Sequence, residues 1–113
     1  MKIISRDDKR YIVSLGIGDE VLGELARLAN DQGIKGASFS VIGAVKELEL
    51  AWYDIESKQY KTRSWREGME IANITGNVTW MNGQVIVHAH GTFAGADFKA
   101  VAGHVNHAVI GAA

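Results

Sequence analysis

The stretch VTWMNGQVIVHAH, residues 78–90, decides the fold. Asn82-Gly83 stands between two runs rich in β-branched and aromatic residues. Both positions of a two-residue hairpin turn need a positive φ, which Asn and Gly adopt most readily. The stretch therefore predicts two antiparallel strands joined by a tight turn, and the second strand carries His88-Ala89-His90.

Short runs of the same kind continue on both sides of this hairpin. They are residues 10–15, 37–42, 45–53, 60–65 and 69–80, with a further strand expected over residues 100–109. Gly43, residues 54–58 and residues 67–68 separate them, as turn-forming residues separate strands. Strand pairing therefore dominates the chain.

One helix is predicted, over about residues 19–32. Its apolar positions form a single stripe, which comprises Val21, Leu22, Leu25, Leu28 and Ala29. Asp19 is expected to cap its N-terminus and Gly33 its C-terminus. The fold class is thus α+β, a mostly antiparallel β-sheet with one principal helix packed on it, in a single domain over residues 1–113.

The composition limits the classes of function. In 113 residues, 12 Lys and Arg balance 13 Asp and Glu, and the net charge is −1. Such a chain lacks the positive field that drives non-specific DNA binding, which argues against nucleic acid as a partner. Because there is no Cys, a metal must be held by His or carboxylate. The early charges and the lack of an apolar run near ~20 residues argue against a signal peptide and a membrane span, and we expect a cytoplasmic protein.

All four histidines lie within residues 88–107. On a strand, His88 and His90 point the same way, roughly 7 Å apart. His104 lies on the next predicted strand, which is free to fold back beside them. Three imidazoles and a water form an open zinc-type site that can polarise a carbonyl or activate the water. The alternative is a set of half-buried histidines hydrogen-bonded to the backbone.

Alternation also predicts the positions of two further titratable side chains. Alternation places Glu70 on the face of Ile74, where a carboxylate beside a metal can act as an acid/base or orient a ligand. An exposed position at the rim is the alternative for Glu70. His107 is expected on the face of Val105, opposite His104, as a packed or interface histidine outside the ligand set.

Two motifs give only weak support for phosphate or nucleic-acid binding. Gly16-Ile17-Gly18 precedes the helix, but Asp19 and Glu20 at the helix N-terminus would repel a phosphate. Residues 58–66 interleave basic and aromatic side chains, as in proteins that bind single-stranded nucleic acid. Charged residues are also a common protection of an exposed strand against edge-to-edge pairing, which is the interpretation we favour.

The chain is apolar over residues 108–113, up to its last residue. This tail is expected to be buried in the core or against another chain, unless a final strand is missing. Three Trp and the many small residues of 91–113 indicate more apolar surface than one small domain hides, which is typical of an oligomer.

Several motifs follow one another along nearly the whole chain. They are residues 16–22 leading the helix, residues 39–45, Tyr53-Asp54 with Tyr60, Glu70-Ile71 with residues 75–78, His88-Ala89-His90 and Gly103-His104. This order resembles the PPC family (plant and prokaryote conserved domain, also called DUF296). The resemblance implies a compact α+β domain that forms a homotrimer and holds zinc through His88, His90 and His104. Acetolactate decarboxylase has a similar fold and binds zinc through a His-x-His pair and a later His, which makes a lyase activity an analogy.

The chain departs from the family in three places. Plant members carry AT-hook motifs for DNA, whereas this chain has no Arg-Gly-Arg-Pro and no proline at all, so the DNA role does not transfer. The plant segment Gly-Arg-Phe-Glu-Ile, used for partner contacts, appears only as Gly68-Met69-Glu70-Ile71. Family members usually continue for another strand, so the domain is expected to lack a C-terminal strand and the trimer to pack differently.

Three functions are compatible with these patterns. The first is a small homotrimeric protein that binds a divalent metal, expected to be zinc, through its histidine trio, with a small molecule as a further ligand. The second is a metal-dependent enzyme of the lyase or hydrolase kind, with Glu70 as a proton carrier. The third is a DNA-associated transcriptional regulator, which the charge balance disfavours.

Overall fold

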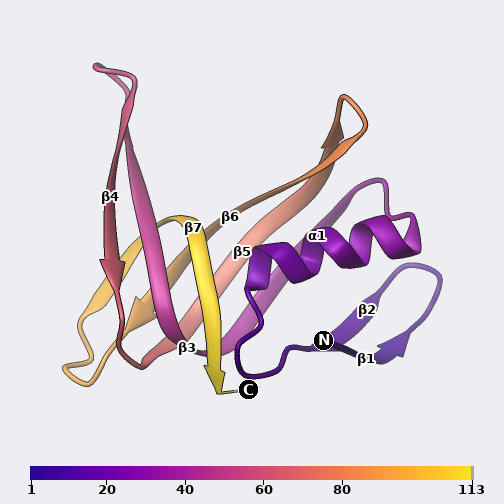
Figure 1. Ribbon diagram of the computed structural model, residues 1–113, viewed down its shortest axis with the longest axis horizontal. Coiled ribbons are helices and arrows are strands. Elements are labelled where there is room, and N and C mark those ends of the chain that lie inside the picture. Colours follow the sequence, from indigo (N-terminus) through magenta and orange to yellow (C-terminus); the bar gives the residue numbers. More distant parts are fainter. Residues whose placement is uncertain (113) are drawn as a thin grey trace.

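The computed structural model describes residues 1–112. Its elements are β1 (Lys2–Arg6), β2 (Tyr11–Ser14), α1 (Val21–Gln32), β3 (Ala37–Asp54), β4 (Gln59–Trp65), β5 (Met69–Met81), β6 (Gln84–Ala94) and β7 (Ala100–Ala112) (Figure 1). All strand pairings are antiparallel; β1 and β2 form a separate hairpin, and the other five strands form one sheet in the order β4-β3-β5-β6-β7. The predicted α+β class is confirmed.

The long strand β3 closes this sheet into a small barrel. Its residues 37–45 pair with β5, residues 44–51 pair with β7, and residues 48–54 pair with β4. The ring therefore runs β3-β5-β6-β7 and back to β3, while β4 lies outside it. The end of β3 and β4 form a hairpin that projects from the ring (Figure 1).

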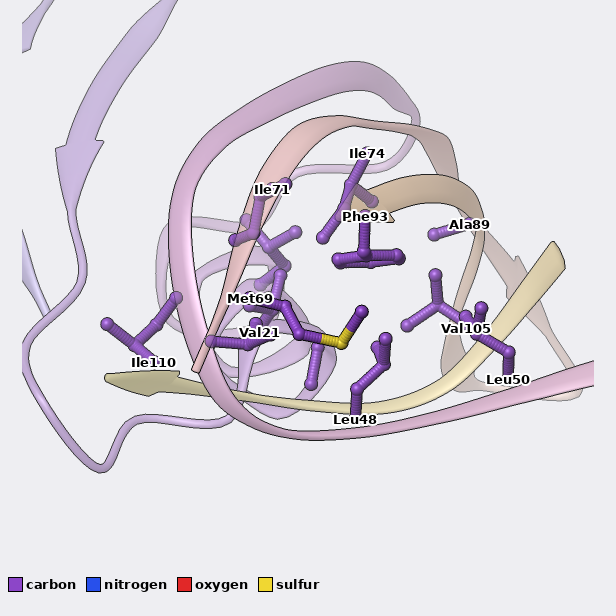
Figure 2. Packing of buried hydrophobic residues seen from close by; sticks show 13 residues of the cluster. Val21, Leu48, Leu50, Met69, Ile71, Ile74, Ala89, Phe93, Val105 and Ile110 are labelled. Atoms are coloured by element: carbon purple, nitrogen blue, oxygen red, sulfur yellow. The ribbon is translucent and has the colours of Figure 1, made fainter. Parts of the chain in front are cut away.

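The hydrophobic core fills the ring. Figure 2 shows side chains from every strand of the ring converging on Phe93, which has no exposed surface. Leu48, Ile74 and Val105 are also fully buried around it. The helix α1 packs on β6 and β7 and adds Val21 to the same cluster. Each such side chain, fully buried, stabilises the fold by about 1.5–3 kcal/mol.

The helix begins and ends almost where its sequence predicts. Gly33 caps the C-terminus in the left-handed conformation, with φ of 67°, as expected. At the other end the expected cap was wrong by one residue, since Glu20 takes this role and accepts hydrogen bonds from the amides of the first turn. Glu20 also accepts from the Ala108 amide in β7, which the shorter Asp19 does not reach. Asp19 instead accepts from the Gly16 amide.

The Asn82-Gly83 hairpin is confirmed, with φ of 53° and 77° at its two turn residues. The predicted break at Gly43 was wrong. The strand β3 continues through this position, because the register with β5 shifts between Val41 and Gly43 and forms a bulge in place of a turn. Ile42, which lies at this shift, is exposed. The strand β1 was not expected at all.

The apolar end of the chain completes the barrel. Ala108 and Ile110 are buried in the core, where β7 pairs with β3. The last residue, Ala113, lies outside the described residues. In the part of the chain that the structure describes, no helix combines the length and apolar character needed to cross a membrane.

Candidate metal centre

The three histidines of the predicted trio lie together on the outer face of the barrel. His88 and His90 stand two residues apart on β6, and His104 on β7 is paired directly with His90. Their ring centroids are 5.1 Å apart for His88 and His90, 5.1 Å for His88 and His104, and 5.6 Å for His90 and His104. One nitrogen from each ring lies within 4.8 Å of the other two.

This geometry fits a single metal ion. Two nitrogens bound to one tetrahedral zinc, each at about 2.0–2.1 Å, are about 3.3 Å apart. The imidazole nitrogens, which lie within 4.8 Å of one another, would draw closer together around such an ion. Imidazole suits zinc, copper, iron and nickel. Among residues 1–112, this is the only cluster of three or more His, Cys, Asp or Glu side chains close enough to share an ion.

The third ligand, His104, lies where strand β7 changes its pairing partner from β6 to β3. Residues 100–104 of β7 pair with β6, and from His104 onward β7 pairs with β3, so His104 faces both His90 and Ala51. Gly103 makes this close approach possible, because a Cβ there would lie 2.9 Å from the carbonyl oxygen of Ala51. The third ligand thus depends on barrel closure.

The electrostatics at His104 favour the neutral form that binds a metal. Partial burial lowers the pKa of His104, and the positive charges that His88 and His90 can carry lower it further. His104 therefore stays neutral at neutral pH, with a lone pair available for a metal. Among residues 1–112, the side chains that donate to main-chain carbonyls are those of Asn30 and Trp80, so the three imidazoles are not held by such bonds.

Two groups of side chains border the trio. On β5, Thr75 is paired with His90 and Asn77 with His88, so both lie on the same outer face. On the other side, the Tyr60 ring of β4 lies 5.9 Å from His104 and 5.0 Å from Tyr53. Tyr60 is a neighbour of the trio that was not predicted from the sequence. The available signal was that Tyr53 ends one predicted strand and Tyr60 begins the next.

The structure does not bring Glu70 to the histidines. Glu70 is exposed and paired with Ala94, five residues along β5 from Thr75, the partner of His90. A register shift between Ile71 and Asn73 breaks the alternation, so Glu70 does not share the inner face of Ile74.

His107 also faces away from the core, contrary to the expected position beside Val105. The register shift in β7 between Val105 and His107 turns this side chain outward, where it is 47% exposed. Its Nε2 lies 3.6 Å from a carboxylate oxygen of Glu47. It remains outside the ligand set.

The fold and the site together define a class of protein, a small antiparallel β-barrel with one covering helix and a three-histidine centre on its outer face. The chain belongs to the Plants and Prokaryotes Conserved (PCC) domain family, whose family model matches residues 4–113. This finding confirms the family that the order of motifs resembles.

Solved structures share the fold closely. A candidate DNA-binding protein from Bacteroides thetaiotaomicron is 38% identical, with a TM-score of 0.90 over 96% of this chain and 76% of that chain. A second candidate DNA-binding protein, from Ralstonia eutropha JMP134, is 36% identical, with a TM-score of 0.88 over 95% and 74%. A metal-containing protein from Archaeoglobus fulgidus is 28% identical, with a TM-score of 0.82 over 87% and 69%. Among curated proteins, none matches this chain.

Proposed function

We propose that this protein binds a divalent metal ion, with zinc as the first choice, through His88, His90 and His104, and that it does so as a homotrimer. The convergence of three imidazole nitrogens within 4.8 Å is the observation that carries this proposal. The resemblance of the chain to a metal-containing protein from Archaeoglobus fulgidus supports it.

The surroundings of the trio suit the binding of a small polar molecule at the metal. His88 and His90 are exposed, so three nitrogen ligands leave a coordination position that solvent can reach. Zinc bound in this way can polarise a carbonyl or lower the pKa of a water ligand. Thr75 and Asn77 offer hydrogen-bond donors and acceptors beside this position, and Tyr60 offers a flat apolar wall.

Metal analysis of protein purified without an affinity tag tests the proposal. After zinc supplementation and desalting, we expect about one equivalent of zinc per chain. The variant His90→Ala should lose most of this metal, whereas the matched control His107→Ala should keep it, because His107 lies beside Glu47 and outside the trio. Less than about a tenth of an equivalent in the unmodified protein would end the metal hypothesis.

The trimer has its own support and its own test. The projecting end of the hairpin of β3 and β4 leaves apolar side chains uncovered outside the metal site, including Tyr53 at 42% and Ile55 at 80% exposure. A monomer rarely leaves so much apolar surface on one projecting element. Light scattering at micromolar concentration should give three times the chain mass; the mass of a single chain would exclude the trimer.

DNA association is a second candidate, because two of the relatives are called candidate DNA-binding proteins. The net charge of −1 predicts only weak, salt-sensitive binding to duplex DNA. Fluorescence anisotropy with labelled duplexes measures the affinity for DNA. Salt-resistant binding to a defined sequence would favour DNA association over the metal-binding function. A lyase or hydrolase activity has less support, because Glu70, the proton carrier expected for such an enzyme, lies away from the histidine trio.

A further inference from the structure

A groove opens where β3, β4 and β7 meet, at the base of the projecting hairpin. Its volume is about 370 Å³, within the range of roughly 300–1,000 Å³ that is typical of small-molecule sites. The side chains that matter for its chemistry are Leu50, Trp52, Lys61, Arg63, Trp65 and Val101.

The charged and aromatic side chains of the groove lie on the face of these strands opposite the metal centre. Across β3 and β4, Leu50 is paired with Arg63 and Trp52 with Lys61, and paired residues project to the same face. Leu50 is buried in the core, so this face continues the interior of the barrel. His104 is paired with Ala51, whose side chain alternates with those of Leu50 and Trp52 and projects to the other face. Ala51, Thr62 and Ala102, which alternate with these residues, also border the groove. Its charged and aromatic side chains nevertheless lie on the face opposite the histidine trio, at the mouth of the barrel.

The lining combines aromatic rings with unopposed positive charge. Trp52 is 62% exposed, and Lys61 and Arg63 are exposed beside it, while no acidic residue lines the groove. In residues 1–112, neither Lys61 nor Arg63 forms an ion pair. The next acidic residue along this face is Asp54, whose carboxylate accepts hydrogen bonds from the amides of the hairpin turn.

We propose that this groove binds a small anion, a carboxylate or a phosphate, that is carried on a flat aromatic body. The Arg63 guanidinium can form two parallel hydrogen bonds to either anion, and Lys61 adds a second charge. The exposed indole of Trp52 stacks on a flat ring, and Leu50 and Val101 form an apolar floor beneath it. This site does not depend on the metal proposed for the histidine trio.

Positive side chains on β4 can also protect the edge of the sheet, and the experiment must distinguish this role from anion binding. The strand β4 is the edge of the five-stranded sheet, and charges there can simply prevent pairing with another sheet. Edge protection requires no ligand and no aromatic neighbour. A ligand site requires that the anion and the flat ring both contribute to binding.

The three tryptophans provide a direct readout by nuclear magnetic resonance. The indole N–H signals are assigned with the variants Trp52→Phe, Trp65→Phe and Trp80→Phe, and the metal-free protein is titrated with 2-naphthoate, 2-naphthamide, adenosine 5′-monophosphate and adenosine. The Trp52 and Trp65 signals should shift with at least one of the two anions. The Trp80 signal should not, because its indole donates to the Ile34 carbonyl beyond the groove. Binding of naphthoate assigns the carboxylate class, and binding of the nucleotide assigns the phosphate class.

Charge variants complete the test. The double variant Lys61→Gln with Arg63→Gln should weaken anion binding at least about tenfold. The matched control, Lys9→Gln with Arg10→Gln, makes the same charge change in the turn between β1 and β2 and should change binding less than about twofold. The double variant His88→Ala with His90→Ala should retain binding, which separates this site from the metal centre. Equal shifts with anions and their neutral analogues, no shift with any probe, or full binding by the Lys61 and Arg63 variant would overturn the proposal.

Discussion

Replacing Gly103 by alanine should weaken metal binding while leaving the barrel folded. The added Cβ would lie 2.9 Å from the carbonyl oxygen of Ala51, whereas ordinary contacts of this kind begin at 3.4 Å. Strand β7 must therefore move away from β3 by about half an ångström, next to His104. Metal–ligand distances tolerate only about 0.2 Å, so we expect a loss of about tenfold to a hundredfold in zinc affinity. The overpacking itself should lower the free energy of unfolding by about 1–3 kcal/mol.

Isothermal titration with zinc measures the affinity, and urea unfolding of the metal-free protein measures the stability. Gly68→Ala is the matched control, because a Cβ at Gly68 meets no atom within 4 Å, and we expect less than about 0.5 kcal/mol of change. If Gly103→Ala binds zinc as tightly as the unmodified protein, the spacing of β7 and β3 does not position His104 for metal binding.

Two other predictions concern pH and the helix cap. The lowered pKa of His104 means that the unfolded chain binds its proton more readily than the folded one, so metal-free protein should lose stability as the pH falls through 6.5 towards the lowered pKa. Urea unfolding over this range should show the loss, and His104→Asn should remove that part of the pH dependence; an unchanged profile would contradict the assignment. Glu20→Ala removes the acceptor for three amides, of Leu22, Gly23 and Ala108, and should lower the free energy of unfolding by about 1–3 kcal/mol. A loss below about 0.5 kcal/mol would mean that water replaces this cap.

Local signals in the sequence predicted the elements well. The Asn82-Gly83 turn, the helix stripe and its cap at Gly33 depend on the conformational preferences of adjacent residues, and all appear in the structure. The α+β class follows from the same signals. The short strand β1 carried no comparable pattern, because five residues of mixed polarity do not show the alternation of a half-buried strand.

Alternation alone placed side chains correctly only where a strand is regular. It holds for His88 and His90, which project to the same face of β6. It fails at Glu70 and His107, because each lies next to a register shift that changes which side chains face the core. Such bulges depend on how two strands fit along their whole length, and no residue near Glu70 or His107 marks them in advance.

The sequence by itself determined the parts of this protein that form between neighbours, which are the central hairpin, the helix and the paired histidines on one strand. Only the tertiary structure decided that β3 closes a ring, that His104 meets His90 across strands, and that Lys61 and Arg63 border a groove. These features join residues far apart in the chain. Their geometry is set by barrel closure and register, which are properties of the packed core as a whole.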